Sequence, residues 1–151
     1  MPRYVIADTS VFILFDKIDR LDILKGVYQS VITTPEIADE YNKPMPDWIK
    51  IESVKDLKYQ SFIQTQIDKG EASAISLAIE KGDSLLILDD LKPRKLAKRL
   101  GLKFTGALGV INKAKGLGYI DKIKPLVDKL KATDFRIADK ILEDLLKRNN
   151  E

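Results

Sequence analysis

Short apolar segments alternate with helical segments over the first 105 residues, and this alternation limits the fold more than any other feature of the sequence. The apolar runs are rich in Val, Ile and Leu and are bounded by turn residues, as buried strands are. Strands separated by helices indicate a parallel sheet with helices on both faces. We therefore expect an α/β protein with strands at residues 3–7, 30–33, 49–54, 84–88 and 103–105.

Cap residues, glycines and prolines mark the ends of the helical segments. Thr34 can cap a helix that starts at Pro35, and Gly82 ends the helix that opens at Gly70. Because no linker or repeat divides the chain, we expect one domain over residues 1–151, with three α/β/α layers, a central parallel sheet of four to five strands and a helical C-terminal part. Helices are expected at residues 11–15, 20–27, 35–41, 56–69, 72–81 and 92–100, with three more after Gly106.

The chain contains no cysteine and no histidine. This excludes thiol catalysis, disulfide scaffolds, zinc fingers and any histidine base. A site built from carboxylates suits hard divalent cations such as Mg²⁺ or Mn²⁺. The net charge of +3 is mildly basic, and it neither requires nor excludes a nucleic-acid partner.

The hydropathy pattern gives no sign of a membrane segment. No apolar run approaches the roughly 18 residues that a membrane span needs. The first residues lack the apolar stretch and the small-residue cleavage site of a signal peptide. We therefore expect a cytoplasmic protein that does not associate with a membrane.

Carboxylates follow two of the expected strands at the point where each strand ends. Asp8 comes directly after the first strand, and Asp89 and Asp90 come directly after the strand at residues 84–88. Ligands of open parallel sheets bind beyond the carboxyl ends of the strands. We expect these acids to meet at one edge of the sheet.

Two further acids lie on apolar helical faces. Glu71 shares a face with Ile75 and Ile79, at intervals of four residues. Glu40 lies one turn after Ile37 on its own helix. A buried carboxylate without a partner is costly, and a cation beside it offsets that cost.

Carboxylates that converge on one pocket repel one another, and some then stay protonated unless a cation is bound. Each acid also has a structural alternative. Asp8 can serve only as a helix cap, Glu71 can complement a helix dipole, and Glu40 can be a surface acid. Asp89 and Asp90 can form a turn or cap the next helix. Their joint placement favours a cation-binding site.

Four short motifs follow one another along the chain. The first is Asp8-Thr9-Ser10, and the second is the block Pro35-Glu36-Ile37-Ala38-Asp39-Glu40-Tyr41, which includes the acid Glu40. The third is Gly70-Glu71-Ala72-Ser73-Ala74-Ile75, and the fourth is Leu86-Ile87-Leu88-Asp89-Asp90. In their order and spacing these motifs resemble those of PIN-domain proteins. Arg94, Ala97 and the segment Gly106-Ala107-Leu108-Gly109-Val110 resemble the DUF3368-type subfamily of VapC-like toxin ribonucleases.

The resemblance implies an endoribonuclease that depends on Mg²⁺ or Mn²⁺ and acts as the toxin of a toxin–antitoxin pair. It also implies a cognate antitoxin protein and a homodimer, for which the apolar run at residues 11–15 offers a contact surface or, alternatively, plain core packing. The sequence departs from many relatives at two positions. Glu71 stands where they have Asp, and Leu88 stands where they have Thr or Ser.

The resemblance also implies roles for individual residues. Asp8, Glu40, Glu71 and Asp90 are the expected catalytic acids. Asp8 and Asp90 would bind the cation, with Glu71 as a further ligand and Asp89 as the alternative to Asp90. Ser10 would orient Asp8 or a water molecule. Arg94 would contact RNA, although a solvated charged helix explains it as well.

Other classes of protein fit the motifs less well. A haloacid-dehalogenase-like phosphatase needs a second Asp two residues after Asp8, where this chain has Ser10. A receiver domain needs its acidic pair and its later Lys in another order. A PIN scaffold that only binds RNA or a partner protein is the remaining alternative, and the presence of all four acids disfavours it.

Overall fold

The computed structural model describes all 151 residues and contains one sheet of five parallel strands. The spatial order is β3-β2-β1-β4-β5, with Ile6 level with Ile32 on one side and with Leu86 on the other. The predicted parallel α/β architecture is therefore confirmed. The strands are β1 (Tyr4–Ala7), β2 (Val31–Thr33), β3 (Ile49–Ile51), β4 (Ser84–Ile87) and β5 (Lys103–Thr105).

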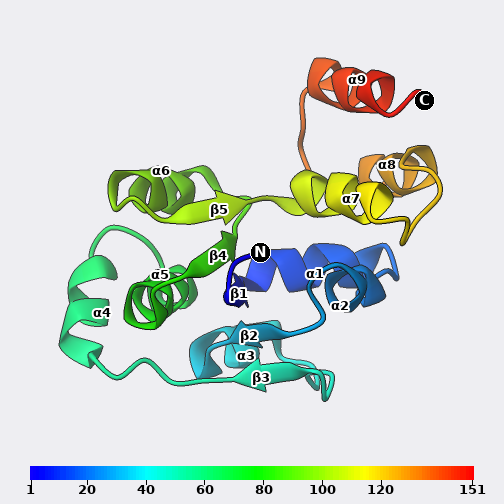
Figure 1. The fold of residues 1–151 in the computed structure, drawn as a ribbon. Coiled ribbons are helices and arrows are strands. Elements are labelled where there is room, and N and C mark those ends of the chain that lie inside the picture. The colour runs from blue at the N-terminus through cyan, green and yellow to red at the C-terminus, as the bar shows by residue number, and fades with distance from the viewer.

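Nine helices surround the sheet. Figure 1 shows α1, α2 and α7 on one side of the sheet and α4, α5 and α6 on the other, so the fold has the three predicted α/β/α layers. The helices are α1 (Thr9–Lys17), α2 (Asp22–Tyr28), α3 (Pro35–Tyr41), α4 (Leu57–Ile63), α5 (Lys69–Lys81), α6 (Leu91–Arg99), α7 (Ala107–Gly116), α8 (Lys124–Lys131) and α9 (Asp139–Arg148).

The chain order explains where a ligand can bind. The chain starts in the central strand β1, runs outward to β3, and then returns across the sheet to β4 and β5. The direction of winding thus reverses between β1 and β4, and such a reversal opens a crevice at the carboxyl ends of the strands. Asp8 and Asp90 lie just beyond β1 and β4, next to this point.

The central strands are apolar because both of their faces are covered. Ile6 and Leu86 are completely buried, and 41 buried residues form one hydrophobic cluster. A parallel strand covered on both faces reads as a continuous apolar run, as β1 and β4 do.

Two predicted elements and one predicted helix face differ most clearly from the structure. The helix expected at residues 56–69 ends at Ile63, because Asp68 caps a new helix, α5, which begins earlier than predicted. The strand expected at residues 49–54 ends at Ile51. Ile79 is 38% exposed, so the buried part of α5 ends at Ala78 rather than continuing along the predicted face.

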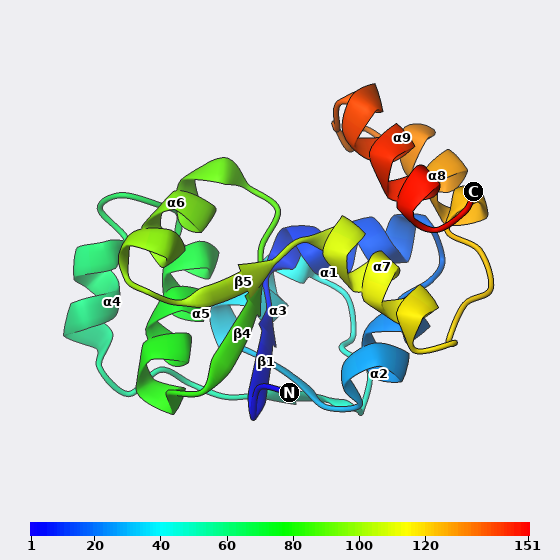
Figure 2. The same cartoon turned by 45° about the horizontal axis from the view of Figure 1, so that its top comes forward.

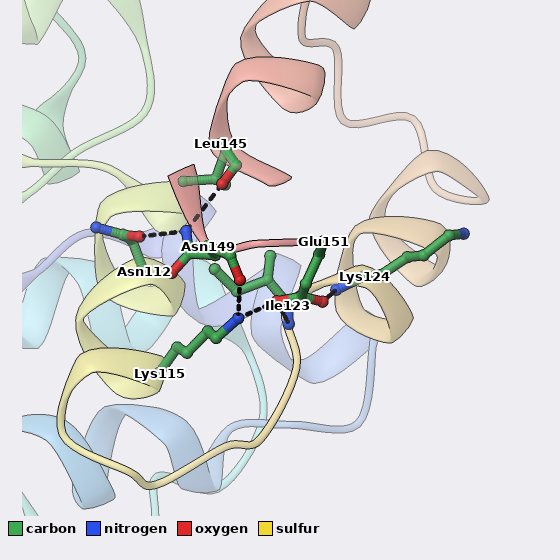
Figure 3. A network of polar contacts seen from close by, with 7 residues as sticks. All are labelled: Asn112, Lys115, Ile123, Lys124, Leu145, Asn149 and Glu151. Carbon is green, nitrogen blue, oxygen red and sulfur yellow. Dashed lines mark hydrogen bonds and ion pairs between the residues drawn. The ribbon is translucent and has the colours of Figure 1, made fainter. Parts of the chain in front are cut away.

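The last two helices lie beside α7 and far from α4, as both cartoon views show (Figures 1 and 2). Apolar residues of both helices belong to the hydrophobic cluster, and a polar network adds to this packing. The carboxylate of Glu151 accepts hydrogen bonds from the backbone N–H groups of Ile123 and Lys124 at 2.8 and 2.9 Å, and it also pairs with Lys115 (Figure 3). None of the helices has both the length and the apolar character needed to cross a membrane.

Candidate active site

Asp8 and Asp90 occupy equivalent places at the ends of neighbouring strands. Each is the residue immediately before a helix, Asp8 before α1 and Asp90 before α6, yet neither side chain makes a capping hydrogen bond. Their carboxylates are therefore not used in capping their own helices. The backbone N–H of Asp8 donates to the carbonyl of Ile87 at 3.3 Å, which keeps the ends of β1 and β4 level.

Glu71 reaches the same place from the first turn of α5. One of its oxygens accepts a hydrogen bond from the backbone N–H of Asp68, and the backbone N–H of Glu71 donates to Asp68 in return. This reciprocal arrangement is a capping box. The predicted structural role of Glu71 at the helix start is thus real, and the same side chain also faces the acids of β1 and β4.

Asp8, Glu71 and Asp90 form a convergent group. Each offers a carboxylate oxygen, and these oxygens all lie within 4.8 Å of one another. Asp8 and Glu71 are 3% and 8% exposed, whereas Asp90 is open to solvent. The group is therefore buried at its base and accessible from one side.

The surroundings of this group favour the protonated form of two acids. Burial raises the pKa of Asp8 to about 7; the backbone N–H of Thr9 opposes this rise, and the charges of Glu71, Asp68 and Glu40 add to it. Burial likewise raises the pKa of Glu71 to about 7; the Asp68 N–H opposes this rise, and the charges of Asp68 and Asp90 add to it. A bound cation would remove the repulsion that produces part of these shifts.

Glu40 lies at the rim of the group and is not one of the three convergent acids. It is exposed, and it accepts a hydrogen bond from the hydroxyl of Thr9 at 3.4 Å. Its carboxylate also lies against Gly70, where any larger residue would displace it. Burial and the charge of Asp68 raise its pKa, and the Thr9 hydroxyl opposes them.

The structure separates Asp89 from Asp90. One oxygen of Asp89 accepts a hydrogen bond from the backbone N–H of Ala107 at 3.0 Å, at the start of α7, and the other is buried without a partner. Burial raises the pKa of Asp89, and the charge of Arg94 opposes this rise. Asp89 therefore has a structural contact that Asp90 lacks.

Arg94 is half-buried rather than free in solvent. Its guanidinium group lies over the ring of Phe104, 5.0 Å from the centroid, and its Nε atom is buried without a partner. This side chain has contacts that a purely solvated charged helix would not provide. Its expected contact with RNA stays a prediction.

The hydroxyl group of Ser10 is free to form a hydrogen bond with a ligand. Its Oγ atom is buried and has no hydrogen-bond partner. Ser10, Asp89 and Asp90 all line a groove of about 400 Å³. An unpartnered hydroxyl beside carboxylates fits a polar ligand or a water molecule at this position.

Asp68 is a residue of the site that was not predicted from the sequence. Its charge contributes to the raised pKa values of Asp8, Glu40 and Glu71, so it belongs to the electrostatics of the site. The Asp-x-x-Glu spacing of Asp68 and Glu71 is a recognisable sequence signature of a helix start. This spacing could have identified Asp68 as a helix-capping residue beside Glu71.

The fold and the three acids define a class: an α/β/α protein with a carboxylate site suited to a hard divalent cation at the carboxyl edge of a parallel sheet. The family model described as "DUF3368: PIN domain" matches residues 4–151. The chain therefore belongs to the PIN-domain family. Among curated proteins, none matches this sequence.

Membership of this family gives the acid group its chemical context. PIN domains are generally metal-dependent nucleases, and a nuclease fold with three convergent carboxylates is what the structure contains. The donor set fits a divalent cation, because all three donors are carboxylate oxygens and two of them are poorly solvated. The phosphatase and receiver-domain alternatives do not belong to this family.

Proposed function

We propose that this protein is an endoribonuclease that uses Mg²⁺ or Mn²⁺ to hydrolyse RNA phosphodiester bonds. The convergence of Asp8, Glu71 and Asp90 within 4.8 Å is the observation that carries the proposal. Two of these acids have pKa values of about 7, which is the electrostatic signature of an acid group that lacks a counter-charge.

Each residue has a role that follows from its place. Asp8 and Asp90 would hold the cation, since neither is used as a helix cap. Glu71 would contribute the oxygen that the capping box leaves free. When bound, the cation would lower the pKa of a water molecule and stabilise the charge that develops on the phosphate.

The residues around this centre would position water and substrate. The unpartnered hydroxyl of Ser10 is placed to orient a water molecule or Asp8. Glu40, tied to Thr9 at the rim, would accept a proton or hold a water molecule rather than bind the cation directly. Asp89 would support the site through its bond to Ala107, and it remains the alternative ligand.

The biological setting is part of the same proposal. Following the family resemblance, we propose that the enzyme is the toxin of a toxin–antitoxin pair, with a cognate antitoxin protein and a homodimeric state. Most of the apolar run at residues 11–15 lies in the core, and Ile13 is its exposed member, at 38%. A dimer contact through this run would have to use Ile13. The cytoplasmic location stays a prediction.

The test is cleavage of labelled RNA by the wild-type protein and by Asp8→Asn, with Mn²⁺ and with EDTA. We expect Asp8→Asn to lose roughly 100-fold or more in rate, because it removes one carboxylate from the group. Asp47→Asn is the matched control, since Asp47 is exposed and lies outside the site. Equal cleavage by Asp8→Asn and the wild type would overturn the proposal. If a calorimetric titration detects no binding of Mn²⁺ at millimolar concentration, a non-catalytic scaffold is favoured.

A further inference from the structure

A groove of about 400 Å³ adjoins the acid group and shares Asp90 with it. Asp89 and Asp90, which follow β4, line the groove next to the acid group. The rest of the lining comes from α1 and from the segment between α8 and α9, which we call the second wall. The lining residues are Ser10, Ile13, Leu14 and Lys17 of α1, and Asp134, Phe135 and Arg136 of the second wall.

The second wall contributes one aromatic ring, one cation and one acid, from Phe135, Arg136 and Asp134. Phe135 is partly buried, packs against the hydrophobic core, and is held in its turn by a hydrogen bond from its N–H to the hydroxyl of Thr133. Ile13 adds an exposed apolar surface beside it. A ring with an apolar neighbour, bordered by positive charge, is a surface on which a nucleobase can stack.

The charges along the groove single out Arg136. Lys17 is paired with Asp134 at 2.9 Å, so these two charges offset each other. Asp89 and Asp90 are negative and would repel a phosphate. Arg136 is exposed and makes no ion pair, which leaves it as the cation of this groove that is free to bind a phosphate.

We propose that the segment at residues 132–138 is a substrate-binding wall of the enzyme. A base next to the cleaved phosphodiester stacks on Phe135, and Arg136 binds a phosphate of the same strand. This inference rests on the proposed ribonuclease function and assigns to it two residues outside the four motifs. RNA is favoured over a protein segment because the groove is continuous with the acid group through Asp90.

The position of the wall is fixed from both sides. The salt bridge between Lys17 and Asp134 ties the segment to α1, while the carboxylate of Glu151 holds the end of the chain against the start of α8 (Figure 3). Because α8 and α9 flank the segment, these contacts add to the packing of Phe135 and Ile137 against the hydrophobic core, which keeps the segment beside the acids. A fixed wall orients a flexible strand at a lower entropic cost than a mobile one.

The experiment measures binding of a short fluorescein-labelled single-stranded RNA by anisotropy, in the Asp8→Asn background so that no cleavage occurs. Phe135→Leu keeps an apolar side chain but removes the ring, and we expect affinity to fall about tenfold. Phe135→Tyr keeps the ring and should bind as the parent does. Arg136→Ala should weaken binding about fivefold and lower the salt slope by about one. Arg148→Ala, on α9 outside the groove, is the matched control and should change neither.

The outcomes separate this inference from the proposed function. One outcome is that the otherwise wild-type protein cleaves RNA while Phe135→Leu and Arg136→Ala bind RNA with unchanged affinity. The proposed substrate-binding wall is then wrong, and the proposed ribonuclease function is retained. If the protein neither binds nor cleaves RNA in Mn²⁺, the proposed function fails and the wall fails with it. If the two variants keep RNA affinity but change the oligomeric state in light scattering, the groove is a contact between copies of this chain and the wall is overturned. Thermal melts of each variant check that it is folded.

Discussion

Asp68 and Glu71 cap each other at the start of α5. The backbone N–H of Glu71 donates to Oδ1 of Asp68 at 2.8 Å, and the backbone N–H of Asp68 donates to Oε1 of Glu71 at 3.2 Å. The helix cap thus fixes the side chain of Glu71, which also belongs to the acid group. Local helix formation and the geometry of the site depend on the same pair of residues.

The first prediction concerns this pair. Asp68→Ala removes both the cap and a negative charge, so we expect a loss of about 1 kcal/mol in the free energy of unfolding. The same change lowers the pKa of Asp8 and Glu71, because the charge of Asp68 raises both. Asp68→Asn keeps the cap without the charge, and should lower these pKa values at little cost in stability. Urea unfolding and NMR titration measure the two effects. Equal stability of the Ala and Asn variants would contradict the capping role.

The second prediction distinguishes the two neighbouring acids at the end of β4. Asp90→Asn should weaken Mn²⁺ binding roughly 100-fold with little change in stability, because Asp90 belongs to the acid group and makes no capping bond. Asp89→Ala should instead lower the free energy of unfolding by about 1–3 kcal/mol, because it leaves the N–H of Ala107 without its acceptor. Asp89→Asn keeps an acceptor and is the control. Calorimetric titration and urea unfolding give the readouts. The assignment is reversed if Asp89→Asn, rather than Asp90→Asn, abolishes Mn²⁺ binding.

The third prediction is the pH dependence of the metal-free protein. The folded pKa values of Asp8 and Glu71, about 7, lie above their ordinary values of 3.8 and 4.5. The folded state therefore holds more protons than the unfolded state between these limits, and stability falls as pH rises from about 4 to about 7. In EDTA we expect a loss of several kcal/mol across this range, because both pKa values are raised and a pKa difference of one corresponds to about 1.4 kcal/mol.

Two controls accompany this titration. Asp8→Asn should flatten the pH dependence, because it removes one of the two groups. Mn²⁺ should raise the melting temperature more at about pH 8 than at about pH 6, because protons compete with the cation for the carboxylates. If the wild-type protein in EDTA becomes more stable as the pH rises from about 4 to about 7, the raised pKa values of Asp8 and Glu71 are contradicted.

The sheet and two of its acids could be predicted because both follow from local patterns. Short apolar runs between helices determine a parallel sheet, and the ends of parallel strands share one edge. That rule alone placed Asp8 near Asp89 and Asp90 without choosing between these two, and the structure brings Asp8 together with Asp90. The position of Glu71 near them also followed from its apolar helical surroundings, although Ile79 at the end of that face is exposed.

Other features depend on contacts between distant segments, which a single sequence does not specify. The bond from Ala107 to Asp89 joins residues 18 positions apart and could not be distinguished from a local turn. The second wall of the groove comes from residues 134–136, over a hundred positions after Ser10. The sequence pattern around Phe135 predicts only a break between two helices. Its place beside the acids is set by how α8 and α9 pack.

The last prediction concerns the network that holds these helices. Burial raises the pKa of Glu151, but the N–H groups of Ile123 and Lys124 and the ammonium of Lys115 outweigh it and lower the pKa to about 2. A depressed folded pKa contributes stability that is present above the ordinary value of 4.5 and is lost as pH falls toward 2. Glu151→Gln removes the charge but keeps an acceptor, so we expect a loss of about 1–2 kcal/mol at neutral pH.

The measurement for Glu151 combines urea unfolding with hydrogen exchange. Exchange in α8 and α9 should accelerate in Glu151→Gln while that in the buried helix α1 changes little, because the network of Figure 3 anchors only the end of the chain. Asp128→Asn is the matched control. Asp128 pairs with Lys124 on the surface, with both side chains more than half exposed, and such a pair contributes little. If Glu151→Gln and Asp128→Asn have the same small effect, the carboxylate of Glu151 does not hold α9 in place, and the groove wall is held by the packing of Phe135 and Ile137 against the hydrophobic core, to which the exposed Lys17–Asp134 pair adds little.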